Sequence, residues 1–376
     1  FFVGSVIGQT TNDYRSRKIG NWNDPATWER FDGTNWVAGV PTIAGSVTSI
    51  KTIAGTTHAV SLPSGIVSGD LLLIFWADAS GSSTAPTLPS GWTQLYTSTQ
   101  GNRVRVAWYK VAVGTETTTL NITSGDENSA HASYRIAAGT YQGLPVSGTV
   151  ATGNNGAPDA PNLTPGFANT NTLWIAASHS AGDDNVPTPV TPANYTDLIT
   201  GYTGSSTTTH ARVATAIREI SAASENPGAF ALGSNVEWAA NTIAIRGVTF
   251  TIPSSASNVI TIRNGHIVTG TAATSADQCT IEAGGQVTVN TGQTWTIADG
   301  TGTDLTVDGT VVNSGTMTMT GTAVYNASSI YQHAQNAGTI PTASWNATST
   351  CNVTGVTNVM PAGIGQNFGH LTWNCA

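Results

Sequence analysis

Charged residues are scarce in this chain of 376 residues. They make up 9% of it, and 13 basic residues are outnumbered by 21 acidic ones, for a net charge of −8. An average soluble domain carries about 25% charged residues. A nucleic-acid-binding protein needs a basic face, and this chain has too few Lys and Arg to build one. The sequence therefore predicts a protein without a nucleic-acid partner.

Long apolar runs are missing and cysteines are few. No apolar run reaches the roughly 18 residues of a membrane-spanning helix, so no membrane span is expected. Three cysteines, Cys279, Cys351 and Cys375, are too few for a disulfide scaffold. One disulfide and one buried thiol is the simplest arrangement in an oxidising compartment.

The chain is instead rich in aromatic residues and glycine, with 11 Trp, 9 Tyr, 8 Phe and 41 Gly. The aromatic and aliphatic residues can build cores, which argues against disorder. A helical bundle would need abundant Ala, Glu, Lys, Leu and Arg at helical period, which this sequence lacks. Composition and length favour extracellular all-β structure in two or three domains.

The first eight residues, FFVGSVIG, are apolar and precede a polar segment. One interpretation is the end of a signal peptide, with Gly8 at the cleavage point. The other is a β-strand that occupies a groove. In the second case residues 1–19 form an N-terminal strand and linker, and the strand inserts into a neighbouring copy. Its assembly residues are Phe1, Phe2, Val3, Val6 and Ile7.

Residues 20–44 contain three tryptophans, Trp22, Trp28 and Trp36, between turn signals. Three indoles so close in sequence indicate a cap with a small aromatic core. They could also provide a platform on which sugar rings stack. We favour the cap and keep the glycan platform as the alternative.

Residues 45–248 form a block of alternating strand-like runs such as RVRVAWYKV, typical of a β-sandwich. The two halves of the block echo each other: GDLLLIFWADAS by TNTLWIAASHSAG, and RVRVAWYKVA by HARVATAIREI. A duplicated strand set suggests either two similar sheets in one sandwich or two fused small sandwiches. We favour one sandwich with a jelly-roll-like core.

Residues 249–376 change character again, because no Lys or Arg follows Arg263. Short β runs are divided by tight turns such as Asn264–Gly265 and Asp308–Gly309, with Thr alternating with Val or Ile. This pattern predicts a stacked parallel β-helix, or β-solenoid. An antiparallel meander fits the local pattern nearly as well. The lack of charge favours the solenoid, because like charges would repel along a ladder of stacked residues.

The segments NWNDPATWERFDGTNWVAGVPT and VITIRNGHIVTG, with TIEAGGQVTVNTGQTWTIADG, resemble secreted bacterial surface proteins with parallel β-helix repeats. In that family the Trp-rich opening runs almost directly into the ITIRNGH-type coil. The resemblance therefore implies that block 45–248 is a domain inserted into the first turns of the β-helix. The block itself is similar to β-sandwich modules of phage-tail and surface proteins, through GDLLLIFWADAS, PSGWTQL and AWYKVA. These resemblances imply exposure at the cell surface and no particular reaction.

No catalytic constellation stands out. The acidic cluster after Arg263, Asp299, Asp304 and Asp308, is most simply a set of turn residues that bind local backbone N–H groups. Calcium binding by the same oxygens is a weaker alternative, and a carboxylate pair for glycoside hydrolysis is weaker still. We therefore expect no enzyme activity and no cofactor, with calcium left possible.

Strand parity gives an expectation for the cysteines. Cys351 alternates with Val353, and Cys375 with Trp373, so both should point inward on neighbouring passes of the chain. We predict a Cys351–Cys375 disulfide and a buried free thiol at Cys279.

The sequence predicts a secreted, non-enzymatic structural protein. We expect a subunit of a surface filament or an adhesin, whose partners are other copies of itself, joined head-to-tail by the N-terminal strand. One alternative is a monomeric carbohydrate-binding adhesin that binds surface glycans. Another is a fragment of a polysaccharide-degrading β-helix enzyme.

Overall fold

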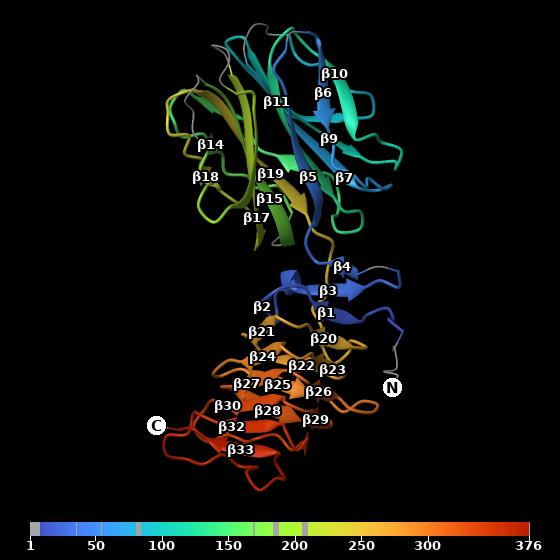
Figure 1. Ribbon diagram of the computed structural model, residues 1–376, viewed down its shortest axis with the longest axis vertical. Coiled ribbons are helices and arrows are strands. Elements are labelled where there is room, and N and C mark those ends of the chain that lie inside the picture. Colours follow the sequence, from blue (N-terminus) through green and yellow to red (C-terminus); the bar gives the residue numbers. More distant parts are fainter. Residues whose placement is uncertain are drawn as a thin grey trace. The chain divides into compact units, whose positions relative to one another are not determined.

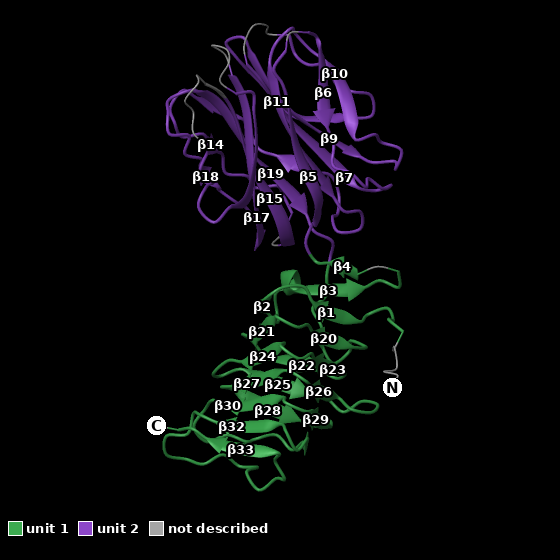
Figure 2. Cartoon of the chain, viewed as in Figure 1, with its two compact units in different colours: residues 1–39, 250–376 green, residues 40–249 purple. Residues whose placement is uncertain are grey.

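The chain divides into two compact units, residues 1–39 with 250–376 (unit 1) and residues 40–249 (unit 2), shown in Figure 2. The sequence placed these boundaries at 44/45 and 248/249. Apart from one 3-10 turn, η1 (Pro25–Thr27), the described elements are strands. The described residues include no helix that is long and apolar enough to cross a membrane. The structure is a computed structural model that describes residues 8–34, 36–53, 55–79, 84–167, 170–182, 188–204 and 210–375.

Unit 1 contains a parallel β-solenoid with three faces (Figure 1). The first face consists of β1 (Tyr14–Ser16), β20 (Ile260–Ile262), β23 (Cys279–Ile281), β26 (Leu305–Val307), β29 (Ala323–Tyr325) and β31 (Ser344–Trp345). The second consists of β2 (Gly20–Asn21), β21 (Ile267–Gly270), β24 (Gln286–Val289), β27 (Thr310–Asn313), β30 (Ile330–His333), β32 (Thr350–Val353) and β33 (His370–Trp373). The third consists of β22 (Thr274–Ala276), β25 (Thr294–Ile297) and β28 (Thr316–Met319). Neighbouring coils pair in parallel, which confirms the solenoid and rejects the meander.

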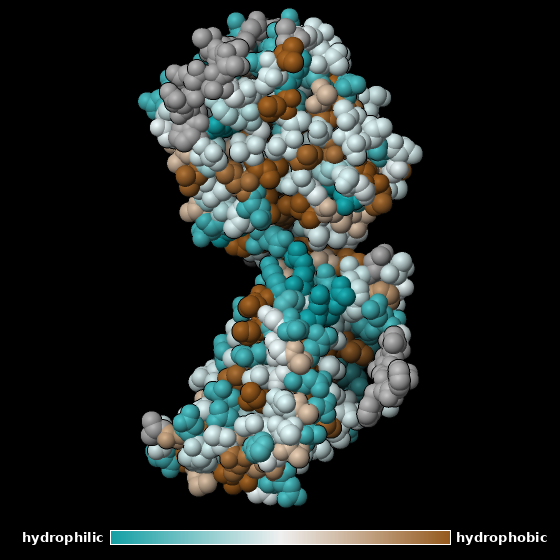
Figure 3. All heavy atoms as spheres, viewed as in Figure 1, coloured by the Kyte–Doolittle hydropathy of each residue, from teal (hydrophilic) through white to brown (hydrophobic). Residues whose placement is uncertain are grey.

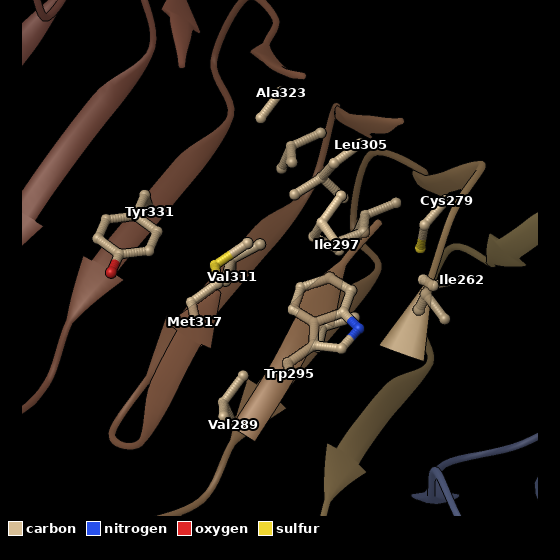
Figure 4. Close-up of a cluster of buried hydrophobic side chains, with 14 of the residues drawn as sticks. Ile262, Cys279, Val289, Trp295, Ile297, Leu305, Val311, Met317, Ala323 and Tyr331 are labelled. Atoms are coloured by element: carbon tan, nitrogen blue, oxygen red, sulfur yellow. The ribbon is translucent and has the colours of Figure 1, made fainter. Parts of the chain in front are cut away.

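Alternation of apolar and polar residues builds the coils. Every second residue of β23 and β24 is buried, and the register places like residues in columns, such as Ile262, Ile281 and Val307. Figure 4 shows this core, in which Cys279, Leu305 and Ala323 of successive coils form a neighbouring column. The turns stack as closely, because a Cβ on Gly309 would collide with the carbonyl oxygen of Gly285.

The N-terminal segment forms the first coil and its cap. β1 pairs in parallel with β20, and β2 with β21. The chain then reverses, so that β3 (Trp28–Phe31) is antiparallel to β1 and β4 (Trp36–Ala38) is antiparallel to β3. An antiparallel pair cannot continue the parallel stack, so β3 and β4 end the solenoid on this side.

Unit 2 occupies the connection between the first and second coils. The chain leaves the cap at Gly39 and returns at Phe250, and a Cβ on Gly39 would lie 2.8 Å from Cγ of Phe250. The two ends of the connection are therefore neighbours within unit 1, as expected for an inserted segment.

Unit 2 is built from antiparallel sheets. The first half has a large sheet in the order β5 (Ile43–Lys51), β11 (Ser129–Ile136), β7 (Leu71–Asp78), β9 (Arg103–Val111), β8 (Thr93–Gln100), and a small sheet of β6 (Thr57–Ser61) and β10 (Thr119–Thr123). The second half has a large sheet in the order β12 (Val146–Ser147), β19 (Glu237–Arg246), β15 (Thr170–Gly182), β17 (His210–Ala222), β16 (Thr196–Tyr202), with β13 (Ala151–Gly153) also on β19. Its small sheet consists of β14 (Asp159–Ala160) and β18 (Gly228–Ala229).

The two halves repeat the same strand order. The sequence β11-β7-β9-β8 in the first large sheet matches β19-β15-β17-β16 in the second. The small sheets also occur at equivalent points of the chain, since β10 lies between β9 and β11, and β18 between β17 and β19. The echoed sequence segments therefore form equivalent strands.

The three larger buried clusters among the described residues of unit 2 hold it together. Leu73 and Phe75 of β7 share a central cluster with Leu173 and Ile175 of β15, so the two large sheets face each other. The outer face of each large sheet has a cluster of its own with its small sheet or the adjoining loops. Each half thus carries a separate core and also contributes to a common one.

Candidate assembly surface

Among the described residues, β33 is the last strand of the second solenoid face. Cys351 and Val353 of β32 are fully buried, but their partners Leu371 and Trp373 in β33 are 46% and 45% exposed. No described residue pairs with the other edge of β33. Figure 3 shows hydrophobic residues at the lower end of the solenoid, where β33 lies. We call Leu371, Trp373 and this free edge the open coil.

The open coil has the chemistry of a strand acceptor. An edge strand presents unpaired N–H and C=O groups to a further strand, and the exposed Leu371 and Trp373 side chains would gain burial from it. Residues 264–376 contain no Lys or Arg, so no basic group of this segment opposes an apolar ligand.

The strand expected to insert, with Phe1, Phe2, Val3, Val6 and Ile7, lies outside the described residues. The structure therefore bears on the surface that would receive such a strand. That surface was not found from the sequence, because LTWNCA gives no sign that the inward residues of β33 are left uncovered.

The expected Cys351–Cys375 disulfide is wrong. All three cysteines are free, with Cys279 and Cys351 buried and Cys375 partly exposed. Cys351 pairs with Leu371, four residues before Cys375. At strand spacing that offset is about 13 Å, whereas a disulfide needs Cα atoms about 4.4–6.8 Å apart. Burial raises the pKa of the Cys279 thiol to about 12, so this thiol stays protonated and fills space.

Trp22 and Trp28 form a cap and leave no platform for a glycan. Both are buried, with ring centroids 5.0 Å apart, and Trp22 also contacts Trp295 of β25 at 5.8 Å. Their indole N–H groups donate to the carbonyls of Pro253 and Trp22, at 3.0 and 2.8 Å. Trp36 is half-buried beneath the guanidinium of Arg15, 4.2 Å from the ring centroid. Three coplanar, open indole faces therefore do not exist here.

The carboxylates of Asp299, Asp304 and Asp308 do not converge. Asp304 is buried and accepts the backbone N–H groups of Gly300 and Thr322, at 2.9 and 2.6 Å, which is the turn chemistry expected. Asp308 instead accepts from the Asn326 amide. Among the described residues no group of three His, Cys, Asp or Glu could hold a metal ion. The calcium and glycosidase interpretations of this cluster therefore lose their geometric basis.

Asp277 is a partner of Asp304 that sequence reasoning missed. Burial, and then a hydrogen bond with Asp304 and the charge of Asp304, raise the pKa of Asp277. The pair forms because coil stacking brings consecutive passes together, a relation that no local motif reveals.

A buried hydrogen-bonded chain in unit 2 was also missed. His131 bonds Ser49 through Nδ1 at 3.0 Å and Ser129 through Nε2 at 2.8 Å, and Ser129 bonds His58 at 2.6 Å. The chain ends at the Gly125 carbonyl, 3.0 Å from Nε2 of His58. Burial, and then the charge of His58, lowers the pKa of His131 to about 3. The chain ties β5, β6 and β11 together.

Two further buried groups face each other across the central core. Tyr96 of β8 lies 2.6 Å from Nε2 of His179 on β15. Burial, and then the charge of Arg105, lowers the pKa of His179 to about 3. Burial, and then the charge of Glu127, raises the pKa of Asp78 to about 8. Because the pKa values of His179 and Asp78 differ from their ordinary values, we expect the stability of unit 2 to depend on pH.

Comparisons with protein-family models, with curated proteins and with solved structures find no match for this chain, so its own geometry is what bears on its function.

Proposed function

We propose that the protein is a secreted structural subunit of an extracellular filament, in which the open coil of one copy receives the apolar segment Phe1–Ile7 of another. The observation that carries the proposal is the half-exposed pair Leu371 and Trp373, which continues two otherwise fully buried columns. The carbohydrate-binding alternative is weakened because Trp22 and Trp28 are buried. The enzyme alternative is weakened because Asp304 and Asp308 are held by separate local hydrogen bonds.

The segment is long enough and apolar enough to pair with β33. Its seven residues lie within the usual strand length of about 3–10 residues and include no charged side chain. Pairing along β33 would supply backbone hydrogen bonds, and the side chains of the segment would cover Leu371 and Trp373. Donor and acceptor are different surfaces of one chain, so the contact is head-to-tail and propagates.

The test compares assembly of four proteins by sedimentation velocity and negative-stain electron microscopy. The full chain should form filaments. Deletion of residues 1–7, or the double change Leu371→Asp and Trp373→Asp, should leave monomers. The control Thr372→Asp places a charge on the outward face of the same strand and should still assemble.

A mixing experiment sharpens the test. The deletion variant keeps its open coil, and the double variant keeps its donor segment, so an equimolar mixture should stop at heterodimers. Filaments from the deletion variant, or no association in the mixture, would show that the two surfaces do not bind each other.

We further propose that unit 2 is an inserted β-sandwich domain, made of two jelly-roll-like halves. Nested pairing supports this description: β5 with β11, β6 with β10 and β7 with β9 in the first half, and β14 with β18 and β15 with β17 in the second. In a jelly roll a long hairpin folds over, which produces such nesting.

Removal of unit 2 should leave the solenoid folded. Deleting residues 40–249 joins Gly39 to Phe250, which already lie in contact. The buried thiols of Cys279 and Cys351 should remain protected from Ellman's reagent, and residues 40–249 alone should unfold in one cooperative step in urea. Immediate reaction of Cys279, or a broad unfolding curve for residues 40–249, would mean that the units depend on each other.

A further inference from the structure

A polar cavity of about 430 Å³ opens at the corner between the second and third faces of the solenoid. Its walls are the turns that follow β24, β27, β30 and β32, so four successive coils contribute to it. We call it the corner cavity.

The cavity exists because the third face stops. β28 is the last strand of that face in the described chain. In the next coil, Ala337 and Gly338 adopt φ values of 57° and 76°, which make a tight turn where a strand would have stacked. Buried His333 holds this turn, with Nε2 2.7 Å from the carbonyl oxygen of Ala337. The displaced backbone leaves space beside β28.

Hydroxyl groups that are available for hydrogen bonding line this space. Within the described residues, the side chains of Thr291, Ser314 and Thr316 make no hydrogen bond. Gln335 donates its amide to the carbonyl of Gly315 and keeps its own carbonyl oxygen as an acceptor. A Cβ on Gly315 would collide with the carbonyl oxygens of Asn290 and Gln293, so the wall here is closely stacked backbone.

We propose that the corner cavity binds an uncharged sugar residue of a glycan. Its lining contains no ionisable side chain, so a charged ligand would lose water without gaining a counter-charge. Hydroxyl and amide groups both donate and accept, which matches the hydroxyls of a sugar. The volume lies within the range of about 300–1,000 Å³ found for small-ligand sites. The proposal is independent of filament assembly.

The test uses an array of immobilised uncharged, sulfated and uronate-containing oligosaccharides. The full chain should bind uncharged members, and raising NaCl from about 0.1 M to about 1 M should leave the signal unchanged, because no ion pair contributes. The double variant Ser314→Ala and Thr316→Val loses two hydroxyls at nearly constant volume. Its affinity for the bound members should fall about tenfold or more.

Thr318→Val is the matched control, because Thr318 lies two residues along β28 from Thr316 and does not line the cavity. It should bind as the unmodified chain does. Protection of the Cys351 thiol in every variant establishes that the coils remain folded. Absence of uncharged-glycan binding by the full chain, equal loss in the control, or salt-sensitive binding of acidic glycans alone would overturn the proposal.

Discussion

Replacing Trp28 by Ala should lower the free energy of unfolding of unit 1 by about 3–5 kcal/mol, the usual cost of removing a fully buried indole. Trp28 is 0% exposed, packs edge-on against Trp22 and donates to the Trp22 carbonyl. Its loss opens a cavity in the cap and leaves that carbonyl without its partner. Urea unfolding followed by labelling of Cys279 and Cys351 measures this effect, because unit 2 contains no cysteine.

Trp36→Ala is the matched control. This indole is half-buried and contacts the Arg15 guanidinium and the Phe31 ring, so a loss of only about 1–2 kcal/mol is expected. Equal effects of the two substitutions would contradict the assignment of Trp28 to the core of the cap. A Trp28 variant that keeps full stability but loses glycan binding would restore the platform interpretation.

Acid should destabilise unit 2 steeply between pH 6.5 and about 3. His131 and His179 have ordinary pKa values of 6.5 that burial lowers to about 3 in the fold. In this window the unfolded chain binds two protons that the folded chain does not. Each imidazole therefore lowers the stability by about 1.4 kcal/mol per pH unit, and by about 5 kcal/mol at the acid end.

Asp78 acts in the opposite direction. Its pKa is raised from 3.8 to about 8, so the folded chain keeps a proton that the unfolded chain releases, and stability falls as pH rises from 3.8 to 8. Below pH 6.5 the two histidines outweigh the single aspartate. Above pH 6.5 only the aspartate contributes, so these three groups place the maximum of stability near pH 6.5.

Pulse-labelling hydrogen exchange measures this, with samples equilibrated in urea at each pH and labelled at one fixed pH. Peptides from β7 and β15 report on unit 2 alone. His131→Gln should reduce the acid slope by about 1.4 kcal/mol per pH unit, whatever it does to stability at neutral pH. An unchanged slope would mean that His131 does not resist protonation in the fold.

Local periodicity carried most of the information on the solenoid. Alternation in segments such as QVTV predicts which residues face inward, and it survives in β24 because each coil repeats the same environment. The echo between RVRVAWYKVA and HARVATAIREI likewise identified β9 and β17 as equivalent strands. Patterns within one strand are decided by short-range geometry, which the sequence expresses directly.

The register between coils depends on the lengths of the loops and turns and not on the pattern within a strand. Cys351 and Cys375 were assigned to neighbouring passes, but the length of the loop before β33 sets Leu371 beside Cys351. Trp22 is buried by Trp295 and by the Pro253 carbonyl, both supplied by later coils. The Asp277–Asp304 pair has the same origin. Such contacts depend on the sum of turn lengths, for which the sequence has no periodic signal.

The shared strand order of unit 2 has a consequence for how its halves depend on each other. Leu73 and Phe75 on β7 occupy the same face as Leu173 and Ile175 on β15, and both faces lie in one cluster. Equivalent strands of the two halves thus bury apolar faces in one common core. A single half would expose that apolar face to water. Because one chain carries both halves, the two faces stay together at a high effective concentration that dilution of the protein does not lower.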